Sequence, residues 1–111
     1  DARTKEEFDG TNTEEGVSRP GHIPGAVNLD WTTTIADGKF RDTGQLKQLL
    51  VGAGAAPGKE IVAYCRVGTR ASALYFVARL LGYSARVYDG SMNEWAGLAG
   101  MPVVKSDSAR P

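Results

Sequence analysis

The feature that most constrains the fold is a continuous apolar run, IVAYC at 61–65, followed after a short loop by a helical pattern. A run without polar alternation is typical of a parallel strand whose two faces are both covered. The helical pattern extends from 69 to 81, and its apolar positions are Ala71, Leu74, Ala78 and Leu81. Because Gly82 is a natural helix stop, these residues predict a strand, a tight loop and one helix.

The flanking segments continue this alternation. Short strands are predicted at 26–30 (AVNLD) and 85–90 (ARVYDG), and loops at 9–25 and 32–42. Strands that alternate with helices in this way predict an α/β fold. We expect a mostly parallel central sheet flanked by helices on both faces.

Three further helices are predicted from their start signals. Thr4 with Glu7, and Ser91 with Glu94, have the spacing of a capping box. Thr43 is expected to cap a helix whose apolar face carries Leu46, Leu49 and Leu50.

The composition narrows the class of protein. The chain has 111 residues, with 13 basic and 13 acidic side chains, so its formal net charge is zero. Zero net charge argues against nucleic acid or an anionic membrane surface as the main partner, and no apolar run approaches the length of a membrane span. One cysteine and one histidine cannot build a metal site, and no cofactor is expected. We expect one domain over 1–105 and a loose polar tail over 106–111.

The loop that follows the apolar run has the chemistry of an anion site. It begins at Cys65, the only cysteine, and contains Gly68 and two arginines, Arg66 and Arg70. The first amides of a helix have no partner inside the helix and carry partial positive charge. Gly68 lets the backbone turn tightly, and successive loop amides can form a concave nest for an anion.

A thiol at the base of such a loop is expected to lose its proton readily, since free cysteine titrates at about 8.5 and nearby positive charge favours the thiolate. Cys65 is therefore a candidate nucleophile that needs no histidine base. The alternative is that Cys65 is a small buried apolar residue at the end of a strand; the glycine and two arginines within five residues favour the nucleophile. The only histidine, His22, is expected to be structural and to bond to backbone.

Taken in order along the chain, several motifs resemble the rhodanese family of sulfurtransferases. They are DAR at 1–3, EEFDG at 6–10, RPGHIPGAVNLDW at 19–31, YCRVGTRAS at 64–72 and YDGSMNEW at 88–95. The resemblance is greatest to the C-terminal, catalytic half of tandem-domain thiosulfate sulfurtransferases. It implies that a strand and an N-terminal rhodanese-like domain precede these residues in a longer protein.

The resemblance also implies roles for individual residues. Cys65 would be the catalytic cysteine, and the loop formed by Arg66, Val67, Gly68, Thr69 and Arg70 would bind the substrate. In the family, the cysteine takes the outer sulfur of thiosulfate, expels sulfite, and passes the sulfur from a persulfide to cyanide or a thiol.

Two positions depart from the pattern of some animal enzymes, and both departures remove positive charge. Val67 stands where those enzymes have lysine, and Glu7 stands where they have a substrate-binding arginine. Arg70 is expected to compensate for the positive charge that these two positions lack. Asp1 resembles the family's aspartate near the loop, and we expect it to support the loop by pairing with a loop arginine, with His22 as a second structural support.

Several alternatives remain open. Arg66 after the cysteine favours thiosulfate, whereas mercaptopyruvate-type loops usually have glycine there. A persulfide relay to a partner protein would use the same cysteine. A phosphatase or arsenate reductase of this fold is a further alternative, but the loops of those enzymes resemble Cys-x5-Arg, one residue longer than the Cys-x4-Arg present here. The last alternative is a rhodanese-like module that binds a partner without catalysis. The cytoplasm is the favoured compartment, with the periplasm the alternative if an upstream signal has been removed.

Overall fold

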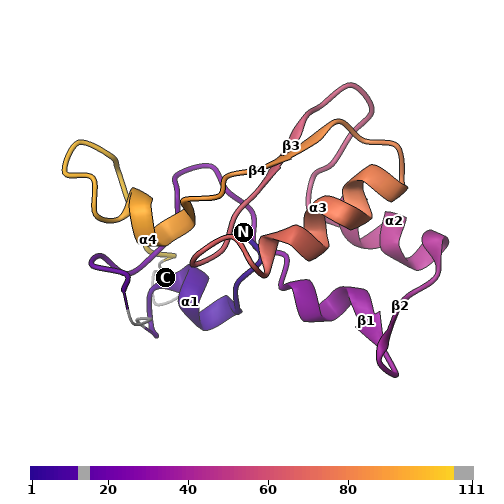
Figure 1. Ribbon diagram of the computed structural model, residues 1–111, viewed down its shortest axis with the longest axis horizontal. Coiled ribbons are helices and arrows are strands. Elements are labelled where there is room, and N and C mark those ends of the chain that lie inside the picture. The colour runs from indigo at the N-terminus through magenta and orange to yellow at the C-terminus, as the bar shows by residue number, and fades with distance from the viewer. Residues whose placement is uncertain (13–15, 107–111) are drawn as a thin grey trace.

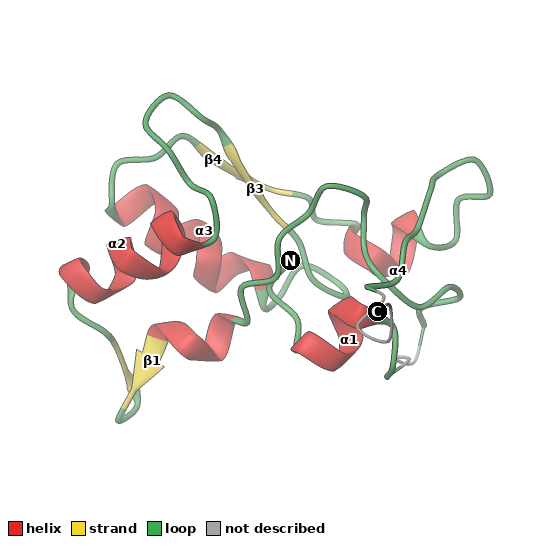
Figure 2. Ribbon diagram, turned by 180° about the vertical axis from the view of Figure 1, so that it is seen from behind, coloured by secondary structure: helices red, strands yellow, loops and turns green. Residues whose placement is uncertain are grey.

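The computed structural model describes residues 1–12 and 16–106. Its elements in chain order are α1 (Lys5–Asp9), the 3₁₀ helix η1 (Trp31–Thr34), β1 (Ile35–Ala36), β2 (Lys39–Phe40), α2 (Thr43–Gly52), β3 (Ile61–Ala63), α3 (Ala71–Leu80), β4 (Ala85–Val87) and α4 (Ser91–Trp95). Figure 1 shows β3 and β4 side by side, with α3 packed along them. Figure 2 shows α2, α3 and β1 at one end of the molecule and α1 and α4 at the other.

The predicted α/β class is confirmed, and its centre is a parallel pair of strands. β3 and β4 run parallel, with Ile61 opposite Ala85. The opposite edge of the β3 segment contacts the beginning of the chain, where the Ala2 N–H donates to the Tyr64 carbonyl over 2.8 Å. These pairings bring residues 1–2, the 61–65 run and β4 side by side in that order.

The predicted strand at 26–30 is not a regular strand in the structure. Its backbone still lies against the first residues, because the Leu29 N–H donates to the Asp1 carbonyl over 2.8 Å and the Trp31 N–H donates to the Ala2 carbonyl over 3.1 Å. The segment is thus placed at the edge of the sheet without forming a full ladder.

The two faces of β3 are not equally covered. Ala63 and Cys65 pack against Ala71 and Leu74 of the α3 segment. On the other face Val62 is 54% exposed, so the prediction that both faces of this run are covered is wrong at that position. Val62 lies in an apolar groove of about 560 Å³ whose other lining residues include Ile23, Tyr64, Tyr88, Trp95 and Met101.

The predicted start of α1 and the predicted end of α3 agree with the structure, whereas the predicted cap of α2 is wrong by one residue. Thr4 and Glu7 form the expected capping box at α1, and α3 ends one residue before Leu81 because Gly82 takes a φ of +89°. The cap of α2 is Asp42 rather than Thr43, since the Asp42 carboxylate accepts the Gln45 N–H over 2.8 Å.

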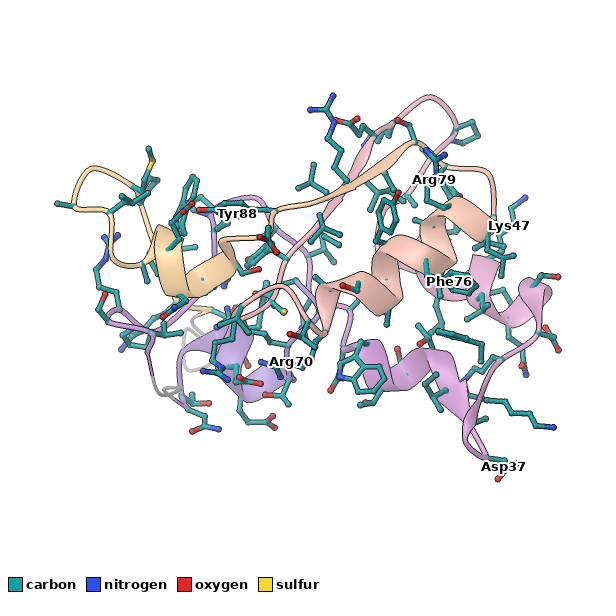
Figure 3. All side chains as sticks on the ribbon, in the orientation of Figure 1. Asp37, Lys47, Arg70, Phe76, Arg79 and Tyr88 are labelled. Atoms are coloured by element: carbon teal, nitrogen blue, oxygen red, sulfur yellow. The ribbon has the colours of Figure 1, made fainter. Side chains whose placement is uncertain are left out.

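The predicted loop at 32–42 contains regular structure. Residues Trp31–Thr34 form η1, and β1 and β2 form an antiparallel hairpin. Asp37 and Gly38 both have positive φ, +53° and +76°. Asp-Gly with two positive φ values is the turn that matches the twist of a two-residue hairpin, and Figure 3 shows Asp37 at its tip.

The predicted capping box at Ser91 is wrong. Ser91 is the first residue of α4 and not its cap. The cap position is taken by Gly90, which has no side chain that could accept a helix N–H. The carboxylate of Glu94 instead accepts the hydroxyl of Tyr88 over 2.6 Å. Burial, followed by that hydrogen bond and the charge of Glu94, raises the pKa of Tyr88 to about 12.

Arg19 holds the segment that follows α4. Its guanidinium donates to the carbonyls of Ala96, Leu98 and Met101 over 2.8, 3.0 and 2.7 Å. A few residues later, His22 and Val104 form an isolated antiparallel bridge. The predicted tail falls, apart from Ser106, outside the described residues. Among the described residues, no helix is long and apolar enough to cross a membrane.

Replacing Arg19 with alanine should lower the free energy of unfolding by about 2 kcal/mol, because four carbonyl acceptors, those of Trp95, Ala96, Leu98 and Met101, lose a charged donor. Urea denaturation followed by tryptophan fluorescence measures this. The matched control is Arg86→Ala, which removes an arginine whose side chain is 74% exposed and pairs with Glu60; its effect should stay below about 0.5 kcal/mol. Equal midpoints for both variants would contradict the role given to Arg19.

Candidate active site

The thiol of Cys65 lies where β3 meets α3, beneath the loop between them. The residue is only 1% exposed. Its Sγ accepts the Gly68 N–H over 3.1 Å and the Ala71 N–H over 3.4 Å. Ala71 is the first residue of α3, and Arg70 at the cap position makes no side-chain cap hydrogen bond. The sulfur therefore takes the place of an N-terminal cap, where the helix dipole favours negative charge.

Gly68 gives the loop its turn. Its φ is +95°, and a Cβ added there would lie 3.0 Å from both the carbonyl oxygen and the Oδ1 of Asp89. The loop is closed on α3 by Ser72, whose N–H and hydroxyl both donate to the Gly68 carbonyl, over 3.2 and 3.1 Å. Only glycine combines this backbone conformation with so close a neighbour.

The backbone of Cys65 is fixed by the turn that begins α4. The Cys65 N–H donates to the Ser91 hydroxyl over 3.1 Å, and the Cys65 carbonyl accepts the Met92 N–H over 2.9 Å. Ser91 is fully buried with a φ of +52°, an uncommon conformation for a residue other than glycine. Sequence reasoning gave Ser91 the role of a helix cap and missed this contact. The contact could have been predicted from the position of Ser91 shortly after β4, because β4 is the parallel neighbour of the strand that leads to Cys65.

The last residue of the loop pairs with α1. The guanidinium of Arg70 donates to both carboxylate oxygens of Glu7, over 2.8 and 3.0 Å. Figure 3 shows Arg70 beside α1. Glu7 was identified in the sequence as a helix-capping residue and as a departure from the family pattern, but its contact with the loop across 63 positions was not predicted.

The remaining loop residues form the outer side of the loop. Val67 is 41% exposed, Thr69 is exposed and Arg66 is half-buried. The Arg66 carbonyl accepts the Asn93 N–H over 2.9 Å, so α4 also holds this part of the loop.

Asp1 does not pair with a loop arginine, as was expected; its partner is Arg3. The Asp1 carboxylate accepts the Nε of Arg3 over 3.0 Å and a terminal nitrogen over 2.7 Å, and both side chains are buried. Arg3 also donates to the Gly21 carbonyl over 2.6 Å. The two residues are two positions apart in the chain, so the pairing is local.

His22 lies against α1, where its Nδ1 is 2.8 Å from the Phe8 carbonyl oxygen. Its ring stacks on the Phe8 ring, with centroids 3.6 Å apart and an interplanar angle of 7°. Phe8 follows Glu7, so the His22 contact orients the helix that presents Glu7 to Arg70.

The arrangement is suited to holding negative charge on a sulfur atom. Two backbone N–H groups point at Sγ, that of Gly68 in the loop and that of Ala71 at the N-terminus of a ten-residue helix. Because these donors are fixed, they need no rearrangement when charge develops on the sulfur or on an atom bound to it. Among residues 1–12 and 16–106, no group of three or more His, Cys, Asp or Glu side chains could hold a metal ion.

Comparison with known proteins agrees with this architecture. The chain is 40% identical over 116 residues to the sulfur carrier protein TtuD of Thermus thermophilus, covering 96% of this chain and 41% of that protein. It is 40% identical over 119 residues to thiosulfate sulfurtransferase of Corynebacterium glutamicum, covering 99% and 39%. The crystal structure of a probable thiosulfate sulfurtransferase matches with a TM-score of 0.74 and 35% identity, covering 93% and 40%.

The chain thus spans about 40% of the length of the curated relatives that it matches. The family model for the rhodanese-like domain matches residues 1–98. With the parallel strand pair, the Cys65 loop and α3 all inside that match, the chain belongs to the rhodanese-like domain family and has its fold.

Proposed function

We propose that this domain is a sulfurtransferase that moves the sulfane sulfur of thiosulfate to cyanide or a thiol through a persulfide on Cys65. One observation carries the proposal: Sγ accepts two backbone N–H groups, that of Gly68 in the loop and that of Ala71 at the start of α3. Relatives named thiosulfate sulfurtransferase, at about 40% identity, support the reaction class.

The reaction has two displacement steps. The Cys65 thiolate attacks the outer sulfur of thiosulfate, a new S–S bond forms at Sγ, and the bond to the sulfonate sulfur breaks with its electron pair leaving on sulfite. The acceptor, cyanide or a thiolate, then attacks the outer sulfur of the persulfide and releases the Cys65 thiolate. Separate donor and acceptor steps are expected to give ping-pong kinetics.

The loop residues have defined parts in this proposal. The amides of Gly68 and Ala71 stabilise the thiolate, and the same group of amides, with those of Val67, Thr69 and Arg70, lines the site for the donor. The side chains of Arg66 and Arg70 supply positive charge for an anionic donor.

A second candidate acceptor is a partner protein. The relative from Thermus thermophilus is named a sulfur carrier protein, and this name supports a relay in which the persulfide sulfur passes to another protein. The chemistry at Cys65 would be unchanged. We also propose that a further rhodanese-like domain precedes this one in the full protein, since the relatives are more than twice as long as the matched region.

Replacing Cys65 with serine should abolish thiocyanate formation from thiosulfate and cyanide, because serine cannot form a persulfide. Mass spectrometry of the peptide carrying Cys65 should show the gain of one sulfur atom after thiosulfate alone. A mass gain without thiocyanate would favour the relay, and 3-mercaptopyruvate as a better donor would favour that substrate class. Hydrolysis of an aryl phosphate without any sulfur transfer would replace the proposal with a phosphatase.

Replacing Gly68 with alanine should lower kcat/KM about tenfold, since an alanine at this positive φ costs about 1–2 kcal/mol and crowds Asp89. The control is Gly58→Ala, where φ is +82° but an added Cβ meets open space. It introduces similar backbone strain away from Cys65. Equal losses of activity in the two variants would mean that strain alone, and not the loop geometry, determines the effect.

Replacing Arg70 with alanine should raise the Michaelis constant for thiosulfate about fivefold, because the loop loses a cation worth roughly 1 kcal/mol to a bound anion. Steady-state kinetics at fixed ionic strength measure this. An unchanged Michaelis constant would exclude Arg70 from donor binding.

A further inference from the structure

The ion pair between Glu7 and Arg70 joins the end of the Cys65 loop to α1. It is bidentate, with donor–acceptor distances of 2.8 and 3.0 Å. The Glu7 side chain is 6% exposed and that of Arg70 is 27% exposed. A paired fork of this kind fixes the orientation of the guanidinium as well as attracting it.

Glu7 is held in place independently of Arg70. One of its carboxylate oxygens accepts the Thr4 N–H over 3.1 Å and the Thr4 hydroxyl over 2.9 Å. The next residue, Phe8, is stacked on His22. These contacts hold the Glu7 carboxylate in position without any contribution from Arg70.

The pair lies close enough to affect charge at the sulfur. Arg70 precedes Ala71, whose nitrogen is 3.4 Å from Sγ. Bond lengths then place the guanidinium within roughly 12 Å of the sulfur, comparable to the Debye length of about 10 Å at 0.1 M salt. A carboxylate on the same guanidinium offsets much of its field at the anion site.

We propose that Glu7 is a specificity-determining residue of the Cys65 site. It fixes Arg70 and offsets its charge, and this lowers the preference of the site for dianions over monoanions. The inference rests on the proposed function, in which the loop binds an anionic sulfur donor. Thiosulfate is a dianion, whereas a persulfide donor carries a single negative charge, so the Glu7 carboxylate reduces the advantage of thiosulfate over a persulfide.

The charge of the ligand provides the test. Coulomb energy is proportional to ligand charge, so removing the Glu7 carboxylate must affect a dianion twice as much as a monoanion on a logarithmic scale. Sulfate and thiocyanate are suitable probes because neither transfers a sulfane sulfur to Cys65. Their dissociation constants can be measured on the full chain from the ¹⁵N–¹H signals of Gly68 and Ala71, at constant pH and ionic strength.

In Glu7→Gln, which keeps an acceptor for Thr4 and for Arg70, sulfate should bind about threefold more tightly and thiocyanate less than about twofold more tightly. Arg70→Gln leaves the Glu7 carboxylate without its cation, so it should weaken the binding of sulfate about twice as much as that of thiocyanate on a logarithmic scale. If Glu7→Gln does not fold, unchanged or equally changed constants in Arg70→Gln would overturn the proposal. The matched control is Asp9→Asn, which removes a carboxylate of the same helix that pairs with Lys5, and it should leave both constants unchanged.

An unchanged sulfate constant in Glu7→Gln, or an equal change for both anions, would overturn the proposal. The proposal would also be overturned if sulfate caused no change in the ¹⁵N–¹H signals of Gly68 and Ala71. If the dissociation constants change as expected in a chain that forms no persulfide from thiosulfate, the role of Glu7 stands and only the proposed reaction fails.

Discussion

The geometry of the site depends on the hydrogen bonds that fix the backbone of Cys65 from both sides. Ser91 accepts its N–H, and Met92 donates to its carbonyl. Its main chain is held at the end of β3, and its side chain points toward the loop, where Gly68 and Ala71 donate to the sulfur. A buried thiol in an apolar setting is ordinarily inert; here the same burial places it against two fixed donors.

The parts that hold the loop come from the two ends of the chain. α1 contributes Glu7, which binds Arg70, and α4 contributes its first residue, Ser91. Arg3 and His22 secure the segments around α1 through the Gly21 and Phe8 carbonyls. The loop is therefore clamped at its first residue and at its last, while Val67 between them remains partly exposed.

Sequence reasoning succeeded where the signal is local. The alternation of strands and helices, the capping box of Thr4 and Glu7, and the stop at Gly82 all depend on neighbours within a few residues. It failed where a distant partner competes for the same group. Ser91 and Glu94 have the spacing of a capping box, but Cys65 and Tyr88 use those side chains instead. The exposure of Val62 likewise depends on tertiary placement that no local pattern encodes. The pairing of Asp1 with Arg3 is instead a local contact, which takes the place of the expected pairing with a loop arginine.

The spacing of these contacts along the chain has a consequence for biosynthesis. Glu7 precedes Arg70 by 63 positions, and Ser91 follows Cys65 by 26. A nascent chain that ends between Ala71 and Ser91 already carries Cys65 and both N–H donors to its sulfur, but it lacks the serine that accepts the Cys65 N–H. Because contacts this distant in sequence form late and slowly, the Cys65 loop acquires its fixed geometry only when almost the whole matched region has been synthesised. A truncated product of translation would carry the cysteine without the site.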